Sequence, residues 1–223
     1  LDGQYSLEVE SETGSSIKTA RAVQIPSPED PLVEDTYFPL GTFEITVDNF
    51  TSSPPPISIT LPEGMTYNHF YCYGWDETGT EQWYELSILN EQIVTFSHND
   101  GSYQDDDQTT NGSITLVGGF GFLDRNGDQI PDEEQTNLTT ISSFDGMHDV
   151  TFEFAQSITV TDLEGIETPG TGDSVHVSSF LYGAFNYAIS GLSSGGSSEV
   201  KIYLPEGASV PGFWQYGPSP DNS

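Results

Sequence analysis

The sequence predicts an all-β protein built from tandem β-sandwich modules. Apolar and polar residues alternate in short segments rich in β-branched and aromatic side chains, which is typical of half-buried strands. Clusters of Pro, Gly, Ser, Asn and Asp separate these segments. No window repeats apolar residues at the spacing of an amphipathic helix, so we expect no helix longer than about two turns. Short strands with turn-rich connections favour β-sandwiches.

The alternating segments define the expected strands in chain order. They cover residues 5–10, 17–25, 42–47, 57–61, 69–73, 82–89, 92–97, 113–117, 150–154, 157–160, 183–189, 199–204 and 213–216. The stretch 161–173 contains a Pro-Gly-Thr-Gly sequence and is the best candidate for a linker.

An internal repeat organises the chain. The sequence Leu-Pro-Glu-Gly occurs at 61–64 and again at 204–207, an offset of 143 residues. Further residues correspond in register, with one small gap: Ile59 with Ile202, Phe70 with Phe213, Gly41 with Gly183, Phe43 with Phe185, Leu7 with Val150 and Val9 with Phe152. Such self-similarity indicates a tandem array with a unit of about 143 residues.

This repeat predicts three parts of unequal completeness. Residues 1–13 hold a terminal strand equivalent to the end of a preceding unit. Residues 14–157 form a complete β-sandwich module, and residues 158–223 form the first half of a second module.

Charge excludes several classes of partner. The chain has 35 acidic and 4 basic residues, a net charge of −31, and such a surface repels nucleic acid and anionic lipid headgroups. No run of 18 apolar residues exists, so we expect no membrane insertion. The composition suits a secreted or cell-surface protein bathed in salt or divalent cations. Cys72 is the only cysteine, which excludes an intrachain disulfide and favours a small core residue.

The acidic segment 124–134 contains the sharpest motif for chemistry. Ca²⁺ takes six to eight oxygen ligands, and side chains at loop positions 1, 3, 5 and 9 can surround it. The predicted ligands are Asp124, Asn126, Asp128 and Asp132, with the main-chain carbonyl of Ile130 at position 7. The spacing resembles the calcium loops of thrombospondin type 3 and dockerin repeats. Position 6 is Gln129 instead of Gly and position 12 is Gln135, and the alternative is a solvated acidic turn.

Three further groups of residues are weaker candidates. The acidic stretch 105–107 is a charged loop tip or a source of ligands for a second cation. Trp75, Trp83 and Tyr84 could stack against a sugar, although adjacent strand residues face opposite ways, so at least one of them belongs to the core. Asn49, Asn111 and Asn137 begin N-x-[ST] triplets, which are acceptors for glycosylation.

Histidine placement gives no catalytic motif. The four histidines are His69, His98, His148 and His176. No two have metal-binding spacing, and none lies in a motif with a nucleophile. We therefore predict that the protein is not an enzyme.

Four segments resemble one known domain family. Residues 38–43, 57–64, 71–74 and 83–86 are similar to the choice-of-anchor U domain, a module of bacterial secreted and surface proteins. The resemblance covers about 38–155, and its first half recurs in 180–217. It implies an extracellular β-rich module without known catalysis.

Two functions follow from these observations. The first is an extracellular structural or assembly protein, a cell-surface or filament-forming repeat subunit with calcium-stiffened loops. In that case Leu7 and Val9 of one chain would pair with a neighbouring chain near Phe185, Ile189, Ile202 and Leu204. The alternative is a calcium-dependent adhesin that recognises a glycan or peptide on another surface.

Overall fold

The computed structural model confirms the all-β class. It describes residues 6–11, 14–50, 56–65, 67–76, 78–102, 105–168, 180–205, 208–210 and 212–213. Strands account for about 48% of the chain and are arranged in several antiparallel sheets. Within the described residues the only helical element is the 3₁₀ turn η1 (Asp132–Glu134), as the absence of helical periodicity predicts.

The chain divides into two compact units, and the division differs from the expected one. Unit 1 is Leu1–Asp124 and unit 2 is Arg125–Ser223, whereas the repeat placed a boundary after residue 157. The reason is strand pairing: β11 (Asp149–Phe154) pairs with β14 (Val200–Tyr203), which follows it, and with β10 (Leu138–Ser142). Residues 138–154 therefore belong to unit 2.

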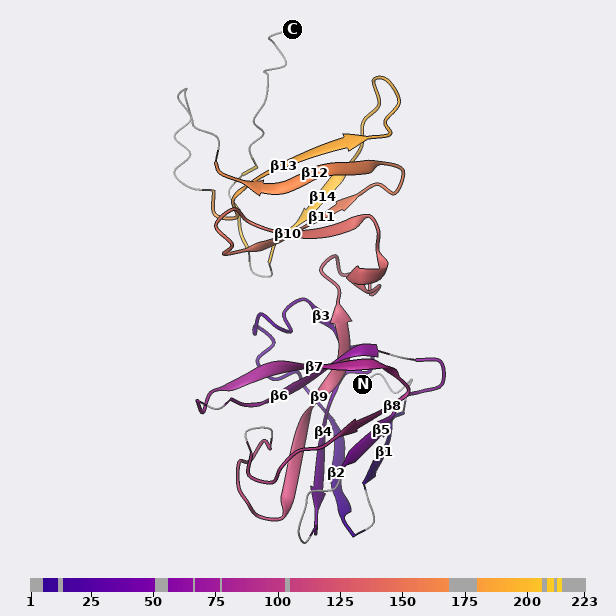
Figure 1. The fold of residues 1–223 in the computed structure, drawn as a ribbon, viewed down its shortest axis with the longest axis vertical. Coiled ribbons are helices and arrows are strands. Elements are labelled where there is room, and N and C mark those ends of the chain that lie inside the picture. The colour runs from indigo at the N-terminus through magenta and orange to yellow at the C-terminus, as the bar shows by residue number, and fades with distance from the viewer. Residues whose placement is uncertain are drawn as a thin grey trace. The chain divides into compact units, whose positions relative to one another are not determined.

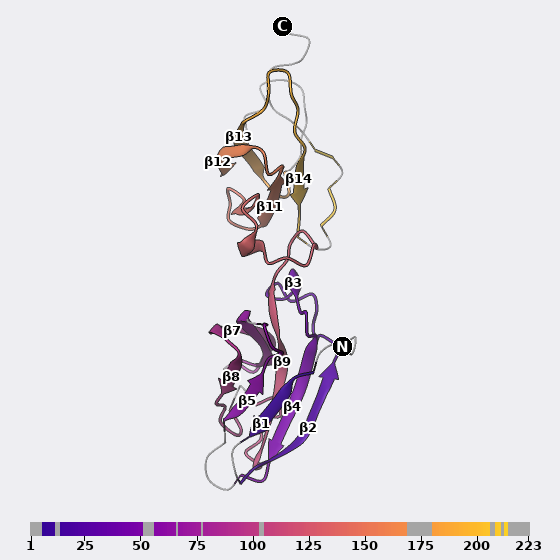
Figure 2. The ribbon, with the colours of Figure 1, turned by 90° about the vertical axis from the view of Figure 1, so that its right-hand side faces the viewer.

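Unit 1 contains two facing sheets (Figures 1 and 2). Its strands are β1 (Glu8–Ser11), β2 (Ser16–Val23), β3 (Thr36–Tyr37), β4 (Thr42–Asp48), β5 (Ile57–Thr60), β6 (Tyr67–Trp75), β7 (Glu81–Glu91), β8 (Ile93–Phe96) and β9 (Ser113–Leu123). One sheet has the order β1-β5-β8. The other has the order β2-β4-β9-β6-β7, and β3 pairs with the end of β9.

The unit 1 core lies between these sheets. Its members alternate along the strands, as the period-2 pattern predicts. From β1-β5-β8 and its flanks come Ile57, Ile59, Leu61, Val94 and Phe96, and from the larger sheet come Leu40, Phe43, Ile45, Val47, Phe70, Cys72, Leu116 and Phe120. All are buried. Because both sheets contribute, unit 1 is a sandwich rather than a single layer.

Unit 2 has a smaller version of this arrangement. The three strands β10-β11-β14 form one sheet, and β12 (Thr159–Ile166) pairs with β13 (Ala184–Ser190) to form another. Val150, Phe152 and Phe154 of β11 are its fully buried apolar centre. Apolar residues of β12, β13 and β14 pack against that centre and are only partly buried.

Most expected strands match observed ones, and the misses are informative. β3 and β10 were not predicted, because β3 has two residues and β10 has the weakly apolar sequence Leu-Thr-Thr-Ile-Ser. The expected linker 161–173 is incorrect at its start, since β12 extends to Ile166. Residues 169–173 of that linker and 214–216 of the last expected strand lie outside the described residues, and Phe213 is not in a strand.

The search for spanning segments covers the same part of the chain. No helix within it is long and apolar enough to cross a membrane.

Candidate functional site

The predicted calcium loop is a turn held together by its own side chains. The Asp128 carboxylate accepts the Ile130 N–H at 2.9 Å and the Asn126 side-chain amide at 3.0 Å. The Asn126 amide oxygen accepts the Asp128 N–H at 3.3 Å. Asx-type bonds of this kind fold a polar segment back on itself. The side chains expected at loop positions 3 and 5 are thereby brought together.

Gln135 joins two of the expected ligands. Its side-chain Nε2 donates to Asp128 Oδ1 at 3.2 Å and to the Ile130 carbonyl oxygen at 3.1 Å. Its Oε1 accepts from Asn126 Nδ2 at 3.1 Å. The oxygens predicted for loop positions 5 and 7 therefore converge on one amide nitrogen, a donor with partial positive charge. Sequence reasoning treated Gln135 as a departure, but the residue at position 12 does lie at this point.

Gln129 also fits the loop better than its side chain suggested. Position 6 of such loops requires a sharp turn that favours glycine. Gln129 has φ 66°, so its backbone is in the left-handed region although it is not a glycine. The missing glycine thus leaves the turn geometry intact, at the cost of some backbone strain.

The two ends of the predicted ligand set have other partners. Asp132 accepts the Arg125 N–H at 3.1 Å and forms an ion pair with Arg125 Nη1 at 3.3 Å. Asp124 is the last residue of unit 1, where its N–H donates to the Asp35 carbonyl at 2.9 Å. Among the described residues, no three His, Cys, Asp or Glu side chains gather at one point. Asn126, Asp128 and Ile130 therefore fit a cation, and Asp132 fits one only after leaving Arg125.

The second acidic stretch supports a loop from within. Asp105 is fully buried, and its carboxylate accepts the N–H groups of Gly101 at 2.9 Å and Thr115 at 3.0 Å. Burial raises the pKa of Asp105 above its ordinary value, and the two bonds oppose that shift. Asp105 is thus a fastening between the loop and β9. It is not part of a charged loop tip.

The aromatic residues proposed as a sugar platform do not form one. Trp83 is buried in unit 1, where its indole N–H donates to the Pro26 carbonyl at 2.8 Å. The Trp75 indole N–H donates to the Asp106 carbonyl at 2.9 Å. Tyr84 packs against the unit 1 core. Each ring has a structural role, so a shared stacking face is absent among these three.

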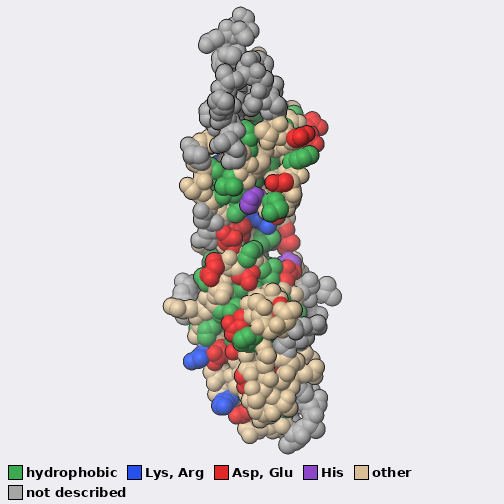
Figure 3. Space-filling model, turned by 90° about the vertical axis from the view of Figure 1, so that its left-hand side faces the viewer, with side chains coloured by type: hydrophobic (Ala, Val, Ile, Leu, Met, Phe, Trp, Pro, Cys, Tyr) green, Lys and Arg blue, Asp and Glu red, His purple; other side chains and the backbone are tan. Residues whose placement is uncertain are grey.

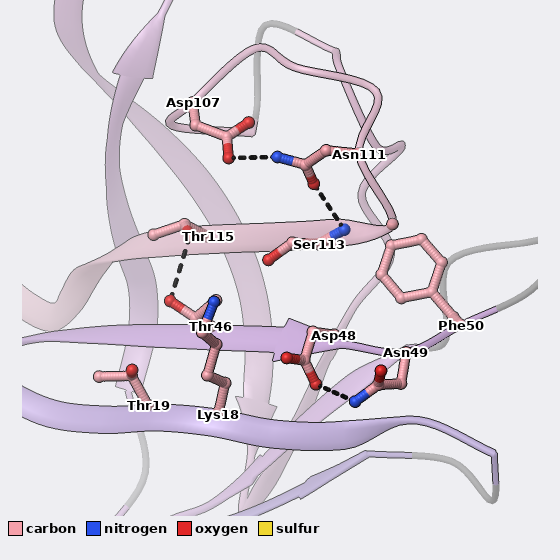
Figure 4. Close-up of a pocket in the computed structure, with 11 residues that line it drawn as sticks. Lys18, Thr19, Thr46, Asp48, Asn49, Phe50, Asp107, Asn111, Ser113 and Thr115 are labelled. Carbon is pink, nitrogen blue, oxygen red and sulfur yellow. Dashed lines mark hydrogen bonds between the residues drawn. The ribbon is translucent and has the colours of Figure 1, made fainter.

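A polar hollow of about 610 Å³ lies on unit 1 beside the ends of β2, β4 and β9 (Figure 4). Its lining includes Lys18, Asp48, Phe50 and Asp107 together with the glycosylation candidates Asn49 and Asn111. Asn49 Nδ2 donates to Asp48 at 2.6 Å, and Asn111 Nδ2 donates to Asp107 at 2.9 Å. Sequence reasoning missed this site because its strands are far apart in the chain.

The remaining candidate residues have structural contacts. The third glycosylation candidate, Asn137, donates from Nδ2 to the Phe154 carbonyl at 3.1 Å. His69 Nδ1 lies 2.6 Å from Glu85 Oε1, and His148 packs edge-on against Tyr182. His98 is buried and stacks on Phe96, while His176 lies outside the described residues. Burial raises the pKa of the Cys72 thiol to about 12, which removes it as a nucleophile near neutral pH.

Comparison with known proteins gives no relative. No protein-family model, curated protein or solved structure matches this chain. The resemblance to the choice-of-anchor U domain therefore stays a prediction from the four segments that suggested it.

Proposed function

We propose that this chain is part of an extracellular structural repeat protein, a tandem array of β-sandwich units of about 143 residues stiffened by calcium loops. The observation that carries the proposal is strand register. Val9 pairs with Ile59, and Phe152, which is 143 residues after Val9, pairs with Ile202. The flanking pairs obey the same offset, from Glu8 with Thr60 and Thr151 with Tyr203 onward.

A second strand pair supports the same offset. In unit 1, Ile17 pairs with Val47 and Ala22 with Phe43. In unit 2, Val160 pairs with Ile189 and Gly165 with Phe185, at offsets of 143 on the first strand and 142 on the second. Both pairs also contain a register shift in the first half of the ladder. A one-residue slip would reverse every side chain, so two matched ladders are unexpected from composition alone.

Matching turns extend the correspondence beyond the ladders. The Gly41 N–H donates to the Phe38 carbonyl at 2.9 Å, and the Gly183 N–H donates to the Phe180 carbonyl at 3.0 Å. Both glycines have positive φ, 69° and 82°. A side chain would strain either turn, which explains why glycine recurs at this position of the proposed repeat.

Charge supports an extracellular location. Carboxylates are scattered over the face of both units in Figure 3, and Lys or Arg side chains are rare there. With a net charge of −31, neighbouring units repel one another unless salt or divalent cations screen them. The same charge supports the expectation that neither nucleic acid nor an anionic membrane is a partner.

An antibody against the chain tests the location directly. It should label intact cells that produce the protein, without permeabilisation, and should also label the surrounding medium if assemblies are shed. Labelling confined to permeabilised cells would contradict the proposal.

Calcium is the proposed cofactor of the loop that begins unit 2. Asn126, Asp128 and the Ile130 carbonyl would bind first, Asp132 would exchange Arg125 for the cation, and Asp124 would complete the set by its position in the sequence. The convergence of Asp128 and Ile130 oxygens on Gln135 supports this assignment. Because the ligands come from one short segment, binding would stiffen the start of unit 2.

Calorimetry tests the calcium proposal. Ligand binding to the folded state raises its melting temperature by mass action, so millimolar Ca²⁺ should raise the transition of unit 2 relative to EDTA. Asp128→Asn should reduce the shift, whereas Asp107→Asn, in the acidic loop of unit 1, should leave it unchanged. An equal effect of Ca²⁺ on both variants and on the unsubstituted chain would reduce calcium to nonspecific charge screening.

The adhesin alternative has one favourable observation, the polar hollow of unit 1. Carboxylates, amides and the Phe50 ring surround it, which is the mixture of hydrogen-bonding and apolar groups that sugars require. Binding to a glycan array that disappears in Asp48→Ala would favour this function. Absence of binding to any glycan or surface peptide leaves the structural role as the better account.

The strand-exchange route that the sequence suggested loses its donor strand. Val9 pairs with Ile59 of its own unit and packs, with Leu7, against that unit's core. The edge of β14 that the exchanged strand would cover is already paired with β11. Self-association would therefore use another edge.

A further inference from the structure

Unit 2 has an incompletely covered apolar surface, here named the open face. It consists of Phe185, Tyr187 and Ile189 on β13 together with Ile202 and Leu204 at β14. Phe185 and Ile189 are partly buried against β11, and Tyr187 keeps 36% of its surface exposed. Within the described residues, β13 pairs only with β12, and β14 pairs only with β11. Each strand therefore has a free edge in the described part of unit 2.

The corresponding surface of unit 1 is fully covered. At the offset of the proposed repeat, Phe43, Ile45 and Val47 correspond to the open-face residues of β13, and all three are buried. Their strand, β4, pairs with β2 on one edge and with β9 on the other. Likewise β5, which corresponds to β14, pairs with β1 and also with β8. Unit 1 thus identifies what is missing from unit 2: strands of the β8 and β9 kind.

The chemistry of β9 explains how such a strand closes the core. Phe120 is fully buried and lies between the rings of Phe43 and Phe70, with centroid distances of 6.1 Å and 4.9 Å. Gly119 makes the approach to the opposite side, since a Cβ there would lie 2.8 Å from the Gly41 carbonyl oxygen. A covering strand must therefore combine a large apolar residue with an adjacent glycine.

Unit 2 preserves the receiving side of this contact. Gly183 adopts the same positive-φ turn as Gly41, with the same hydrogen bond to a phenylalanine carbonyl three residues earlier. Phe185 takes the place of Phe43. We propose that the open face is a completion surface for a segment of the 67–123 type, supplied by the next copy of the repeat on the same polypeptide. This inference rests on the proposed tandem array.

A second molecule of this chain is a poor source of that segment. In unit 1, β9 pairs with β4 and with β6, and Phe120 is fully buried. Withdrawing β9 to cover another chain would expose the donor's own core, including Phe43 and Phe70. The donor loses what the acceptor gains, and both chains also lose the freedom of separate molecules. The next copy in the array has no such conflict.

An extended chain tests the completion surface. A copy of residues 67–124 replaces residues 210–223, which keeps the 143-residue offset. We expect the melting temperature of unit 2 to rise by about 10 °C, since a newly covered apolar face adds several kcal/mol to a small unit. Binding of an apolar dye such as ANS should fall at least about threefold relative to the 223-residue chain.

The matched control is Gly119→Val in the appended copy alone. The added side chain would meet the turn at Gly183 and the side chain of Phe180, so the gain in melting temperature should disappear. Tyr187→Glu gives a second control, because it should be tolerated in the 223-residue chain and should abolish the gain in the extended chain. Should the extended chain fail to fold, dye binding by the 223-residue chain and its loss in Tyr187→Glu still test the open face.

Three outcomes would overturn the inference. One is an extended chain whose unit 2 melts and binds dye as before. Another is equal stabilisation by the unsubstituted and Gly119→Val copies. The third is a 223-residue chain that dimerises and binds no dye, with Tyr187→Glu restoring the monomer, which would assign the face to a second copy. The cell-surface and calcium experiments do not depend on this face, so their failure would be separate.

Discussion

Units 1 and 2 contain corresponding strand pairs, yet they bury them to very different degrees. Val9 with Ile59 and Phe152 with Ile202 are matched pairs at the base of each unit. In unit 1 the residues facing them from β4 are completely buried, whereas in unit 2 their counterparts on β13 are only partly buried or exposed. At one equivalent position the exposed fraction is 1% for Ile45 and 36% for Tyr187.

This contrast separates two physical requirements of a sandwich. Strand pairing needs alternation, a few long-range hydrogen bonds and compatible turns, and both units have these. A closed core needs further strands that cover both sheet faces, and only unit 1 has them among the described residues. The difference teaches that register and closure are encoded in different segments, with closure carried by residues 67–123.

The largest expected effect comes from truncating equivalent phenylalanines. Phe70 is 0% exposed and Phe213 is 76% exposed. Phe70→Ala should lower the free energy of unfolding of unit 1 by about 3–5 kcal/mol, because it removes a buried ring and leaves a cavity. Phe213→Ala should change the stability of unit 2 by less than about 0.5 kcal/mol. Urea unfolding followed by circular dichroism measures both.

Phe152→Ala is the control for that comparison. It is fully buried in unit 2, so its truncation should destabilise unit 2 measurably. Equal losses for Phe70→Ala and Phe213→Ala would mean that the two units are equally closed.

Gln135→Glu should sharpen the role of the loop at the start of unit 2. Without calcium, the new carboxylate faces Asp128 Oδ1 and the Ile130 carbonyl, where the Gln135 amide now donates. Repulsion between these oxygens should lower the melting temperature in EDTA. With calcium, an additional charged ligand at position 12 should tighten binding by about tenfold. Isothermal titration calorimetry measures the affinity, and a variant that binds calcium no better contradicts the loop assignment.

The pH dependence of unit 1 gives a smaller effect. Burial raises the pKa of Asp106 in the folded state, and the nearby carboxylates of Glu81 and Glu44 raise it further. The folded state therefore holds its proton at a higher pH than the unfolded chain does, so stability rises as pH falls through the folded pKa toward about 3.8. Asp106→Asn should flatten this rise and stabilise unit 1 near pH 7. Melting curves from pH 7 to pH 4 test it, and an unchanged slope in the variant would contradict it.

The smallest effect is a difference in chemical access rather than stability. Cys72 is buried and its thiol pKa is raised to about 12, so a thiol reagent at pH 8 should label it only after unfolding. A cysteine introduced on the open face by Tyr187→Cys should react rapidly in the folded chain. Mass spectrometry after brief labelling counts the modified sites. Slow labelling at both positions would indicate that the open face is covered in this chain.

The sequence predicts the strands of this protein better than the way they are grouped. Alternation located nearly every strand of more than three residues, because half-buried strands leave a period of two in the sequence. It missed β10, whose five residues contain two threonines and which is stabilised by pairing with β11. That pairing moved the boundary between the units from residue 157 to Asp124. Long-range pairing of this kind leaves little trace in local sequence.

Site prediction succeeded where ligands are close in the chain and failed where they are not. The segment 126–135 gathers Asn126, Asp128 and Ile130, because local Asx bonds determine its shape. The polar hollow of unit 1 was missed because three distant strands build it. Trp83 was considered for sugar binding, although its adjacent position to Tyr84 already required one inward-facing ring.

Hydrogen exchange of β4 against β13 tests the central claim most directly. β4 has paired neighbours on both edges, so its amides should exchange only through opening of unit 1. β13 pairs with β12 alone among the described strands, so the amides that point to its other edge should exchange at least about a hundredfold faster than those of β4. Alternating fast and slow amides along Ala184–Ser190 are the predicted result. Uniform slow exchange along β13, equal to that of β4, would contradict the claim that unit 2 has the pairing of unit 1 without its closure.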